Sequence, residues 1–448
     1  MKKILVLGAG RSTHTLIDYL KEKAPIHDWH ITICDLSLEL ASAQLGDSSR
    51  TSAIQFNIHD EDQRNKEISQ ADLVISMLPA RFHPLAASCC IKHKKDFLTA
   101  SYVAPEIKAL DEQAKKNGNL FLMECGLDPG IDHMSAMLVL NRLKDKGAEL
   151  LDFETFTGGL LAPDPKEDNP WQYKFTWNPR NVVLAGQGGV KFKQEGTYKY
   201  IPYHRLFRRS EILHIPGYGY FEGYGNRDSL KYIDIYGLRG IRTMYRGTLR
   251  RPGFCKAWNT FVQLGATDDT YEMEIVGEMT HRDFINSFLL YNPKDSVELK
   301  LAHYMGLDIE GEEMYRLKWL DIFDKEPVGL ERGTPAQILE HILKKKWSLT
   351  PADKDMIVML HKFKYVEEGQ LKEIQSHMVC TGKDDIQTGM SMTVGLPLGI
   401  AAESMLTGAI QEKGGHIPIK PGIYLPLLKG LEAHGISFVE QEKALVTT

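Results

Sequence analysis

The chain has 448 residues, of which 43% are hydrophobic and 25% are charged, and its formal net charge is −5. This length exceeds one ordinary hydrophobic core, so we expect two or three domains. The negative charge disfavours nucleic acid as a general partner, and no apolar run approaches the roughly 20 residues of a membrane span.

A strand, a glycine turn and a helix are predicted at the start of the chain. Ile4 to Leu7 is a continuous apolar run bounded by glycine, which is typical of a strand buried on both faces of a parallel sheet. Gly8 and Gly10 then allow a tight turn, and apolar residues recur at helical spacing over 13–23. This arrangement indicates a dinucleotide fold, in which pyrophosphate lies at the helix N-terminus. Thr13 stands where the third glycine is usual, so the match is incomplete.

An acidic residue ends the second predicted strand. Residues 29–35 are a β-branched run that ends in Asp35, which lies 25 positions after Gly10. Such a carboxylate accepts hydrogen bonds from the adenosine ribose and repels a 2′-phosphate, so Asp35 favours NAD over NADP. The alternative is that Asp35 only caps the following turn or helix.

Predicted strands alternate with predicted helices over the first 125 residues. After Cys34 we expect strands at 53–58, 72–76, 96–99 and 119–123, and helices at 60–70, 82–93 and 105–117. This alternation is typical of a parallel, doubly wound sheet, whose ligands lie at the carboxyl ends of the strands. Those ends carry Asn57, Ser76, Pro79, Ser101, Tyr102 and Glu124. The loop with Ser76 and Pro79 suits a nicotinamide ribose, and an ordinary strand-to-helix turn is the alternative.

The segment Gly126-Leu-Asp128-Pro-Gly130 precedes a helix that we expect over 131–143. Asp128 followed by Pro129 suggests an N-cap and a first helical residue. In the functional alternative Asp128 binds a substrate ammonium at the mouth of the sheet, and both roles can hold together. His133 is expected to be a packed or hydrogen-bonded helix residue.

The pattern changes after Leu151. Residues 152–157 alternate as an antiparallel strand does, residues 158–163 are expected to form a loop, and residues 170–180 are an aromatic segment with Lys174 at its centre. Residues 273–364 show mostly helical spacing, which predicts a small helical subdomain, with a strand returning over 358–366.

The last expected element is an apolar helix over 392–411. It contains Gly395, Gly399 and Gly408, and small residues permit close packing, so we expect this helix to dock on the first domain. Its apolar part is too short and too interrupted for a membrane span.

Arginine and tyrosine are concentrated between Ile201 and Cys255, where nine arginines and seven tyrosines stand against four acidic residues. Arginine binds carboxylates bidentately and stays charged when desolvated, so this segment predicts a substrate with several carboxylates. Nucleic acid is the rival interpretation, which the negative net charge disfavours. Arg227 and Arg250 are the stronger candidates because each lies in a turn-rich segment.

The six cysteines have no CxxC spacing and predict packed, reduced thiols rather than a metal site. No signal-like apolar region follows the N-terminal lysines, so we expect a cytoplasmic protein.

Several longer motifs resemble one family. They are Ser101-Tyr102-Val103, the segment 124–133, Gly158-Gly-Leu-Leu-Ala-Pro163, Asn169-Pro-Trp-Gln-Tyr-Lys-Phe-Thr-Trp177, Gly225-Asn-Arg-Asp-Ser229 and Arg246-Gly-Thr-Leu-Arg250. In this order they resemble saccharopine dehydrogenase of the glutamate-forming kind, also called saccharopine reductase, over essentially the whole chain. The resemblance implies interconversion of saccharopine with glutamate and 2-aminoadipate semialdehyde in lysine metabolism, with hydride moving to or from a nicotinamide. The three carboxylates of saccharopine agree with the arginine-rich segment.

The resemblance also implies an α/β fold with three domains and a homodimer. A Rossmann-type doubly wound sheet is expected in 1–128 with 390–448, a mixed α/β substrate and dimerisation domain in 129–272 with 352–389, and a small helical domain in 273–351.

The family pattern assigns roles to individual residues. Saccharopine would be held by Ser101, Tyr102, Asp128, Arg227, Thr248 and Arg250. The cofactor would be held by Gly8, Gly10, Arg11, Ser12, Thr13, Asn57, Ser76 and Pro79, with Asp35 added by the argument above. An acid/base is needed for the amine proton and the attacking water; Asp128, Tyr102 and Lys174 are unranked candidates, and the substrate amine or bulk water is a further option.

One departure from the family matters for the cofactor. Fungal members look arginine-bearing at the second strand tip, as an NADP enzyme should be, whereas this chain has Asp35. We therefore expect an enzyme that prefers NAD, with NADP possible. Two alternative functions are a relative that acts on another imine-linked amine, such as a carboxyspermidine-type substrate, and a non-catalytic dinucleotide-binding protein. The arginine-rich segment disfavours a polyamine, and the presence of both Arg227 and Arg250 disfavours a non-catalytic protein.

Overall fold

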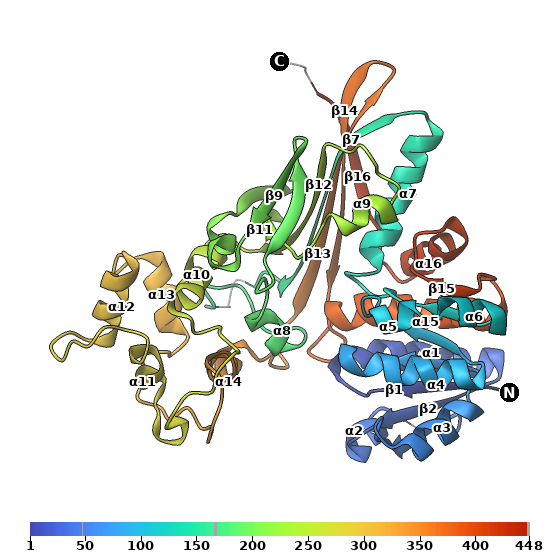
Figure 1. Ribbon diagram of the computed structural model, residues 1–448, viewed down its shortest axis with the longest axis horizontal. Helices are drawn as coiled ribbons and strands as arrows, with labels where there is room; N and C mark the ends of the chain where they lie inside the picture. The colour runs from blue at the N-terminus through green and yellow to red at the C-terminus, as the bar shows by residue number, and fades with distance from the viewer. Residues whose placement is uncertain (47, 165–167, 446–448) are drawn as a thin grey trace. The chain divides into compact units, whose positions relative to one another are not determined.

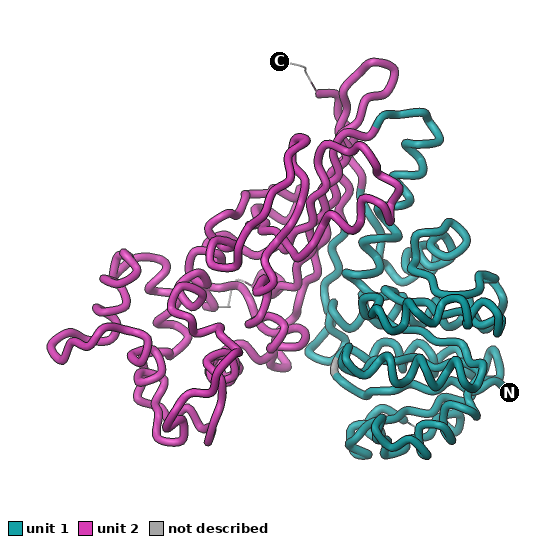
Figure 2. The backbone as a smooth tube through the Cα atoms, in the orientation of Figure 1, with its two compact units in different colours: residues 1–149, 378–439 teal, residues 150–377, 440–448 magenta. Residues whose placement is uncertain are grey.

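The computed structural model describes residues 1–46, 48–164 and 168–445, which fall into two compact units (Figures 1 and 2). Unit 1 consists of residues 1–149 and 378–439, and unit 2 of residues 150–377 and 440–448. The residues expected to form a helical domain, 273–351, lie within unit 2, so a third domain stays a prediction. The end of the expected segment 390–448 lies outside the described residues.

Unit 1 is built on a seven-stranded sheet with the order β15-β6-β5-β4-β1-β2-β3. The strands are β1 (Lys2–Leu7), β2 (Trp29–Asp35), β3 (Thr51–Gln55), β4 (Leu73–Ser76), β5 (Asp96–Thr99), β6 (Leu120–Leu122) and β15 (Gly414–His416). Every pairing between neighbours is parallel. The expectation of a doubly wound parallel sheet is confirmed. Strand β15 was not expected, because Gly414-Gly-His lacks the apolar run of a buried strand.

The helices of unit 1 form two groups that contact within themselves (Figure 1). The elements are η1 (Arg11–Thr13), α1 (His14–His27), α2 (Leu38–Ser42), α3 (Glu61–Gln70), η2 (Ala80–Phe82), α4 (His83–His93), α5 (Pro105–Lys108), α6 (Asp111–Asn117), α7 (Ile131–Asp145), α15 (Gly389–Thr407) and α16 (Pro421–Ala433). Helices α3, α5 and α6 contact α4, and α15 contacts both α1 and α16. Leu5, Val74, Phe97 and Phe121 of the sheet share one buried core with residues of α3 and α4.

Helix α15 docks on α1 through its glycines, as the small residues predicted. A Cβ added to Gly395 would lie 2.6 Å from the backbone nitrogen of Leu16, and one added to Gly399 would lie 2.6 Å from the ring of Tyr19. The expectation that this helix is the last element is wrong, because β15, α16 and β16 (Val439–Ala444) follow it. Strand β16 escaped notice because all six of its residues are exposed and most are polar.

Unit 2 is built on a nine-stranded sheet with the order β10-β11-β12-β7-β13-β14-β16, in which β8 pairs with β12 and β9. The strands not yet introduced are β7 (Glu149–Leu161), β8 (Val190–Gln194), β9 (Thr197–Ile201), β10 (Glu211–Ile215), β11 (Gly219–Gly225), β12 (Thr243–Arg250), β13 (Asp355–Glu367) and β14 (Gln370–Thr381). Strand β12 runs antiparallel to β11 and parallel to β7, so the sheet is mixed. The strand predicted over 358–366 is confirmed as part of β13.

Two features of β7 differ from the predicted ones. The alternating pattern predicted an antiparallel strand, and the pairing with β12 is parallel, while β13 is the neighbour on the other side. Residues 158–161, expected in a loop, continue the strand. A Cβ at Gly158 would lie 2.5 Å from the carbonyl oxygen of Leu249, so this glycine permits close strand contact rather than a turn.

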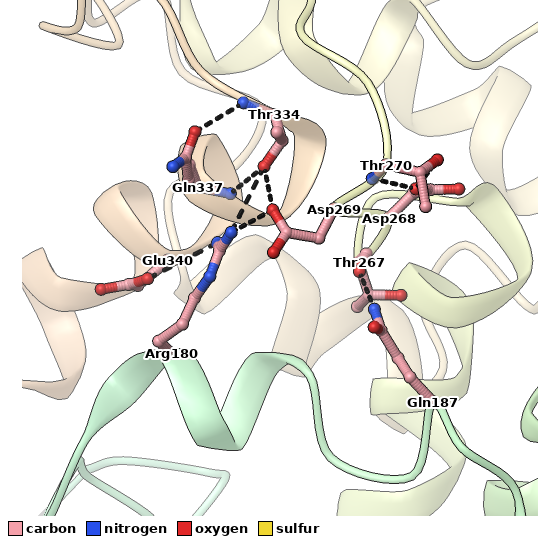
Figure 3. A network of polar contacts seen from close by, with 9 residues as sticks. All are labelled: Arg180, Gln187, Thr267, Asp268, Asp269, Thr270, Thr334, Gln337 and Glu340. Atoms are coloured by element: carbon pink, nitrogen blue, oxygen red, sulfur yellow. Dashed lines mark hydrogen bonds and ion pairs between the residues drawn. The ribbon is translucent and has the colours of Figure 1, made fainter. Parts of the chain in front are cut away.

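In unit 2 a polar network joins two of the helices. The elements are α8 (Pro179–Val183), η3 (Tyr203–Arg208), α9 (Lys231–Ile235), α10 (Phe254–Leu264), η4 (Val276–Glu278), α11 (His281–Asn286), α12 (Val297–Met305), α13 (Glu312–Trp319) and α14 (Pro335–Trp347). Arg180 of α8 binds the carboxylate of Asp269 and lies 3.7 Å from Glu340 of α14 (Figure 3). Thr334, the N-cap of α14, donates to the same Asp269 at 2.7 Å. Among the described residues, no helix combines the length and apolar character needed to cross a membrane.

The glycine contact between α15 and α1 gives the first prediction. Gly395→Ala should lower the free energy of unfolding by roughly 1–3 kcal/mol, because the added methyl meets backbone and the crowding outweighs the better helix propensity of alanine. Denaturant unfolding followed by circular dichroism measures this. Gly188→Ala is the control, since a Cβ there meets nothing within 4 Å; equal stability of the two variants would refute the packing argument.

Candidate functional site

The glycine turn after β1 is held on one side and open on the other. Gly8 has φ of +103°, and a Cβ there would lie 3.0 Å from the carbonyl oxygen of Met77. The Ala9 N–H donates to Asp35 Oδ2 at 2.8 Å. A Cβ at Gly10 would meet nothing within 4 Å, so space remains beside the backbone just before η1 and α1. A pyrophosphate fits this arrangement, since anions favour open backbone at a helix N-terminus.

Thr13 explains the missing third glycine. Its side chain is buried, and its hydroxyl donates to the carbonyl oxygen of Gly10 at 2.6 Å. Gln44 donates to the carbonyl oxygen of Ala9 at 2.7 Å. Two side chains, those of Thr13 and Gln44, therefore bind carbonyl oxygens of the turn. Ser12 is half-buried in η1, and the side chain of Arg11 lies outside the described part of the structure.

Asp35 ends β2 beside this turn and is half-buried. Its Oδ1 accepts from the Ser37 N–H at 3.0 Å, which confirms the expected turn-capping contact, while Oδ2 accepts from Ala9. Each carboxylate oxygen keeps a second lone pair, so the ribose role is compatible with both contacts and stays a prediction. Residues 36–49 contain no lysine or arginine that could neutralise a 2′-phosphate.

The other predicted cofactor residues follow β3 and β4. Asn57 is exposed, and its side-chain oxygen accepts from the His59 N–H at 3.0 Å. Pro79 is exposed and caps η2. Ser76 is fully buried at the end of β4, and its hydroxyl lies 2.8 Å from Nδ1 of His83. The structure therefore turns the Ser76 side chain toward α4.

Ser101, Tyr102 and Asp128 are brought together after β5 and β6. The Tyr102 hydroxyl donates to Asp128 Oδ1 at 3.2 Å. Glu124 makes two hydrogen bonds to the Ser101–Val103 loop. Its N–H donates to the Ser101 carbonyl oxygen at 3.0 Å, and its Oε1 accepts from the Val103 N–H at 3.1 Å. These three predicted substrate residues thus lie on one hydrogen-bonded loop pair.

The expectation that Asp128 caps the next helix is wrong. Helix α7 begins at Ile131 and its N-cap is Gly130. The chain turns back on itself before the helix: the Gly126 N–H donates to the Pro129 carbonyl oxygen at 3.0 Å, and a Cβ on Gly130 would lie 2.1 Å from the Gly126 oxygen. This turn delays the helix and leaves Asp128 beside Tyr102.

His133 lies inside α7, is fully buried, and places Nε2 2.8 Å from Glu124 Oε2. Its expected role as a hydrogen-bonded helix residue is confirmed. Through Glu124, this pair also supports the Ser101–Val103 loop.

Arg250 ends β12 in unit 2 and is a buried cation without an acidic partner among the described residues. Its guanidinium carbon lies 4.8 Å from the centre of the Tyr173 ring and 5.2 Å from that of Phe254. Nη1 donates to the Leu249 carbonyl oxygen at 2.8 Å, while Nε is buried without a hydrogen bond. Glu222, its cross-strand neighbour, instead accepts from the Gly253 and Cys255 N–H groups, both at 2.9 Å. The geometry leaves a donor edge that suits a carboxylate.

Two more predicted substrate residues belong to unit 2. Thr248 is half-buried on β12, two positions before Arg250 and therefore on the same face of the strand. Arg246 continues this face and stacks over the ring of Tyr232 at 4.2 Å. Arg227 is exposed in the loop after β11, with a left-handed φ of 50°.

Lys174 occupies a different environment from the one expected of an acid/base. It is buried, and its Nζ lies 2.9 Å from both carboxylate oxygens of Asp353. Burial raises the pKa of Asp353, but the hydrogen bonds from Thr350 and Lys174 outweigh it, so this pKa lies below the ordinary 3.8. The geometry indicates a structural ion pair.

Sequence reasoning missed two residues that shape the site. Gln44 follows no motif, and His83 stands in an ordinary apolar helix, so the only available signal was a polar residue close to a strand end. No group of three or more His, Cys, Asp or Glu residues suited to a metal occurs in the part of the chain that the structure describes.

Comparison with known proteins gives consistent matches. Residues 4–122 match the family model described as "Saccharopine dehydrogenase NADP binding domain", and residues 126–436 match "Saccharopine dehydrogenase C-terminal domain". "Saccharopine dehydrogenase [NADP(+), L-glutamate-forming]" of Schizosaccharomyces pombe is 30% identical, with 98% of this chain and 99% of that protein covered. The structure of apo saccharopine dehydrogenase (L-Glu forming) from Saccharomyces cerevisiae superposes with a TM-score of 0.90 at 29% identity, covering 99% of this chain and all of the other.

Longer relatives match as well. "Alpha-aminoadipic semialdehyde synthase, mitochondrial" of Bos taurus is 32% identical over 98% of this chain. The chain spans only 48% of that protein, about half its length.

The Lys174–Asp353 pair gives the second prediction. Lys174→Met should lower the free energy of unfolding by about 3 kcal/mol at neutral pH, because it leaves a buried carboxylate without its cation. The lowered pKa of Asp353 means that its stabilisation is complete above the ordinary value and is lost as pH falls through the folded value. The difference from wild type should therefore shrink below about pH 4 in urea unfolding.

Lys191→Met is the matched control, because Lys191 is exposed and its nearest carboxylate oxygen lies 4.0 Å away. A Lys174 variant that is as stable as this control at every pH would contradict the structural assignment.

Proposed function

Because this chain belongs to the saccharopine dehydrogenase family, we propose that it interconverts L-saccharopine with L-glutamate and 2-aminoadipate 6-semialdehyde, using a nicotinamide cofactor. In the oxidative direction a carbon bonded to the secondary amine nitrogen of saccharopine loses a hydride and the nitrogen loses a proton, which gives an imine. Water then adds to the imine carbon, and the bond between this carbon and the nitrogen breaks. The products are then the free amine of glutamate and the aldehyde.

The observation that supports this substrate best is Arg250. A guanidinium that is 5% exposed, stacked on two aromatic rings and without an acid among the described residues is costly unless a ligand supplies the anion. Saccharopine supplies carboxylates, whereas a polyamine would require acids at this position. Thr248 and Arg227 would add a hydroxyl and a second cation from the same unit.

The cofactor would be held by the glycine turn of unit 1. The nicotinamide, when bound, supplies the hydride donor or acceptor. Gly8 and Gly10 let the backbone approach a pyrophosphate, and the Asp35 carboxylate would accept from the ribose hydroxyls. Pro79 would lie along the nicotinamide ribose.

Tyr102 and Asp128 are the acid/base candidates that the geometry favours over Lys174. Their hydrogen bond of 3.2 Å lets the carboxylate accept a proton from the phenol, or from the substrate ammonium, at one position. Lys174 is engaged with Asp353 and acts as a structural residue in this proposal.

We propose NAD as the preferred cofactor. The matched domain and the fungal relatives carry NADP in their names, so the proposal rests on this chain's own residues. Asp35 would place a negative charge at the ribose position, and no cation follows it over residues 36–49. A 2′-phosphate would meet like charge there, and no cation in 36–49 would offset it.

We further propose a homodimer that acts in lysine metabolism, as the resemblance implies, and a cytoplasmic location, which fits the six buried free cysteines. Sedimentation velocity of the purified protein and fractionation of the source cells would test these two proposals separately.

Reduction of the nicotinamide, followed by its absorbance with purified protein and saccharopine, tests the function. Turnover with NAD supports the whole proposal, and turnover only with NADP keeps the reaction and removes the cofactor preference. No turnover with either would contradict the function.

The third prediction concerns Asp35. Asp35→Asn should shift the ratio of kcat/KM for NAD to that for NADP at least tenfold toward NADP, because it removes the like charge that opposes the phosphate. Ser37→Ala, which removes only the N-cap hydroxyl of α2, should leave the ratio unchanged. A wild-type preference for NADP, or an unchanged ratio in Asp35→Asn, would show the electrostatic argument to be wrong.

The fourth prediction concerns Arg250. Arg250→Lys keeps the charge and loses the planar fork, so KM for saccharopine should rise about tenfold to a hundredfold while the Kd for the cofactor stays the same. Steady-state kinetics and cofactor titration by fluorescence measure the two quantities. Arg239→Lys is the control, because Arg239 is exposed and paired with Asp234; equal kinetics in both variants would remove Arg250 from the substrate site.

A further inference from the structure

His83 links two serines that belong to the predicted site, and no motif assigned it a role. It opens helix α4 and is buried. Its Nδ1 lies 2.8 Å from the Ser76 hydroxyl at the end of β4, and its Nε2 lies 2.7 Å from the Ser101 hydroxyl beyond the end of β5. The imidazole therefore spans two neighbouring strand ends.

The ring carries no charge at neutral pH. Burial lowers the pKa of His83 to about 4, and none of the described residues places a carboxylate in hydrogen-bond contact with it. A neutral imidazole has one donor and one acceptor, and its hydrogen-bond partners decide which nitrogen carries the proton.

Ser76 decides the tautomer. Its side chain is fully buried, and among the described residues its hydroxyl contacts only Nδ1 of His83. A proton on Nδ1 would leave the Ser76 hydroxyl hydrogen buried without an acceptor, which costs free energy. With the proton on Nε2 instead, Ser76 donates to Nδ1 and every group is satisfied.

The oxygens around Nε2 agree with this assignment. Thr99 donates its hydroxyl hydrogen to the Ser76 carbonyl oxygen at 2.8 Å, so its oxygen, 3.5 Å from Nε2, is left as an acceptor. Ser101 Oγ, at 2.7 Å, is the nearer acceptor for the Nε2 hydrogen. Both neighbours of Nε2 can thus receive a proton from it.

This tautomer determines the direction of the Ser101 hydrogen bond. The Ser101 oxygen accepts from His83, and no described residue accepts the hydrogen of the Ser101 hydroxyl. Ser101 is half-exposed at the carboxyl edge of the sheet, on the loop that also carries Tyr102.

We propose that His83 is a positioning residue that holds the Ser101 hydroxyl as a hydrogen-bond donor to a carboxylate of the substrate. The carboxylate rests on the proposed function, whereas the direction of the hydrogen bonds rests on the geometry of unit 1 alone. A hydroxyl that donates to a carboxylate makes a charge-assisted bond, and its lone pairs stay available to accept the hydrogen bond from His83 Nε2.

Nitrogen NMR of protein labelled at histidine tests the hydrogen bonds without any turnover. Long-range proton–nitrogen correlations should show His83 with a pyridine-like Nδ1 and a pyrrole-like Nε2. Its signals among the 16 histidines are identified by their loss in His83→Gln and their shift in Ser76→Ala. Ser76→Ala should also allow a mixture of tautomers, since the constraint is gone. A proton on Nδ1 in the wild type, or a doubly protonated ring, would overturn the proposal.

Kinetics test the effect on the substrate. His83→Asn keeps a group near Ser76 and loses the donor to Ser101, whereas the longer amide of His83→Gln can still donate to Ser101. His83→Asn and Ser101→Ala should each raise KM for saccharopine about tenfold, His83→Gln should raise it less, and the double variant should add nothing further.

The Kd for the cofactor separates positioning from a general structural role. It should stay within twofold of wild type in His83→Asn, and a parallel loss of cofactor and substrate affinity would overturn the proposal. Additive effects of the two single variants would overturn it as well. If the wild type does not turn saccharopine over, the proposed function fails, while the NMR result still decides the direction of the Ser101 hydrogen bond.

Discussion

The parallel direction of all the strands in unit 1 is the constraint on which its candidate site depends. Parallel strands end at one edge of the sheet, so residues that follow β1, β2, β4, β5 and β6 meet there although the sequence separates them widely. Hydrogen bonds continue past the strand ends: Gly8 donates to the Cys34 carbonyl oxygen at 2.7 Å, Met77 to that of Leu7 at 2.8 Å, and Cys125 to that of Thr99 at 3.1 Å. The loops that carry the site therefore begin with backbone hydrogen bonds that extend the sheet.

In unit 2 the main constraint is the burial of positive charge. Arg246 and Arg250 lie on one face of β12, and each stacks its guanidinium on an aromatic ring. Aromatic faces lower the cost of desolvating a cation, but by far less than a carboxylate does. Glu222 could have paired with Arg250 across the strands, yet its carboxylate caps the start of α10. Glu222 thus caps the helix, and no acid among the residues that the structure describes pairs with Arg250, an arrangement that would suit a ligand carrying the anion.

Much of unit 1 followed from the sequence, because strong periodicity and glycine spacing are local signals. The alternation of strands and helices, the turn at Gly8 and the docking of α15 through Gly395 all came from such patterns. Pairing direction is not local, so the alternation in residues 152–157 could not show that β7 runs parallel to β12. Asp128 next to Pro129 gave a local capping signal, and the backbone contact between Gly126 and Gly130 overrode it. Lys174 pairs with Asp353, and His83 contacts Ser101. No spacing rule in the sequence connects the members of either pair.

Asp35 shows how closely the turn and the choice of cofactor are coupled. Its Oδ2 holds the Ala9 N–H, the middle residue of the glycine turn, while Oδ1 fixes the turn into α2. The same carboxylate that would bind ribose therefore also shapes the backbone that would receive the pyrophosphate. An arginine at this position would provide a charge for a 2′-phosphate but no acceptor for Ala9, so a simple exchange of charge would disturb the turn. An arginine at position 35 would therefore have to be accompanied by another acceptor for the Ala9 N–H.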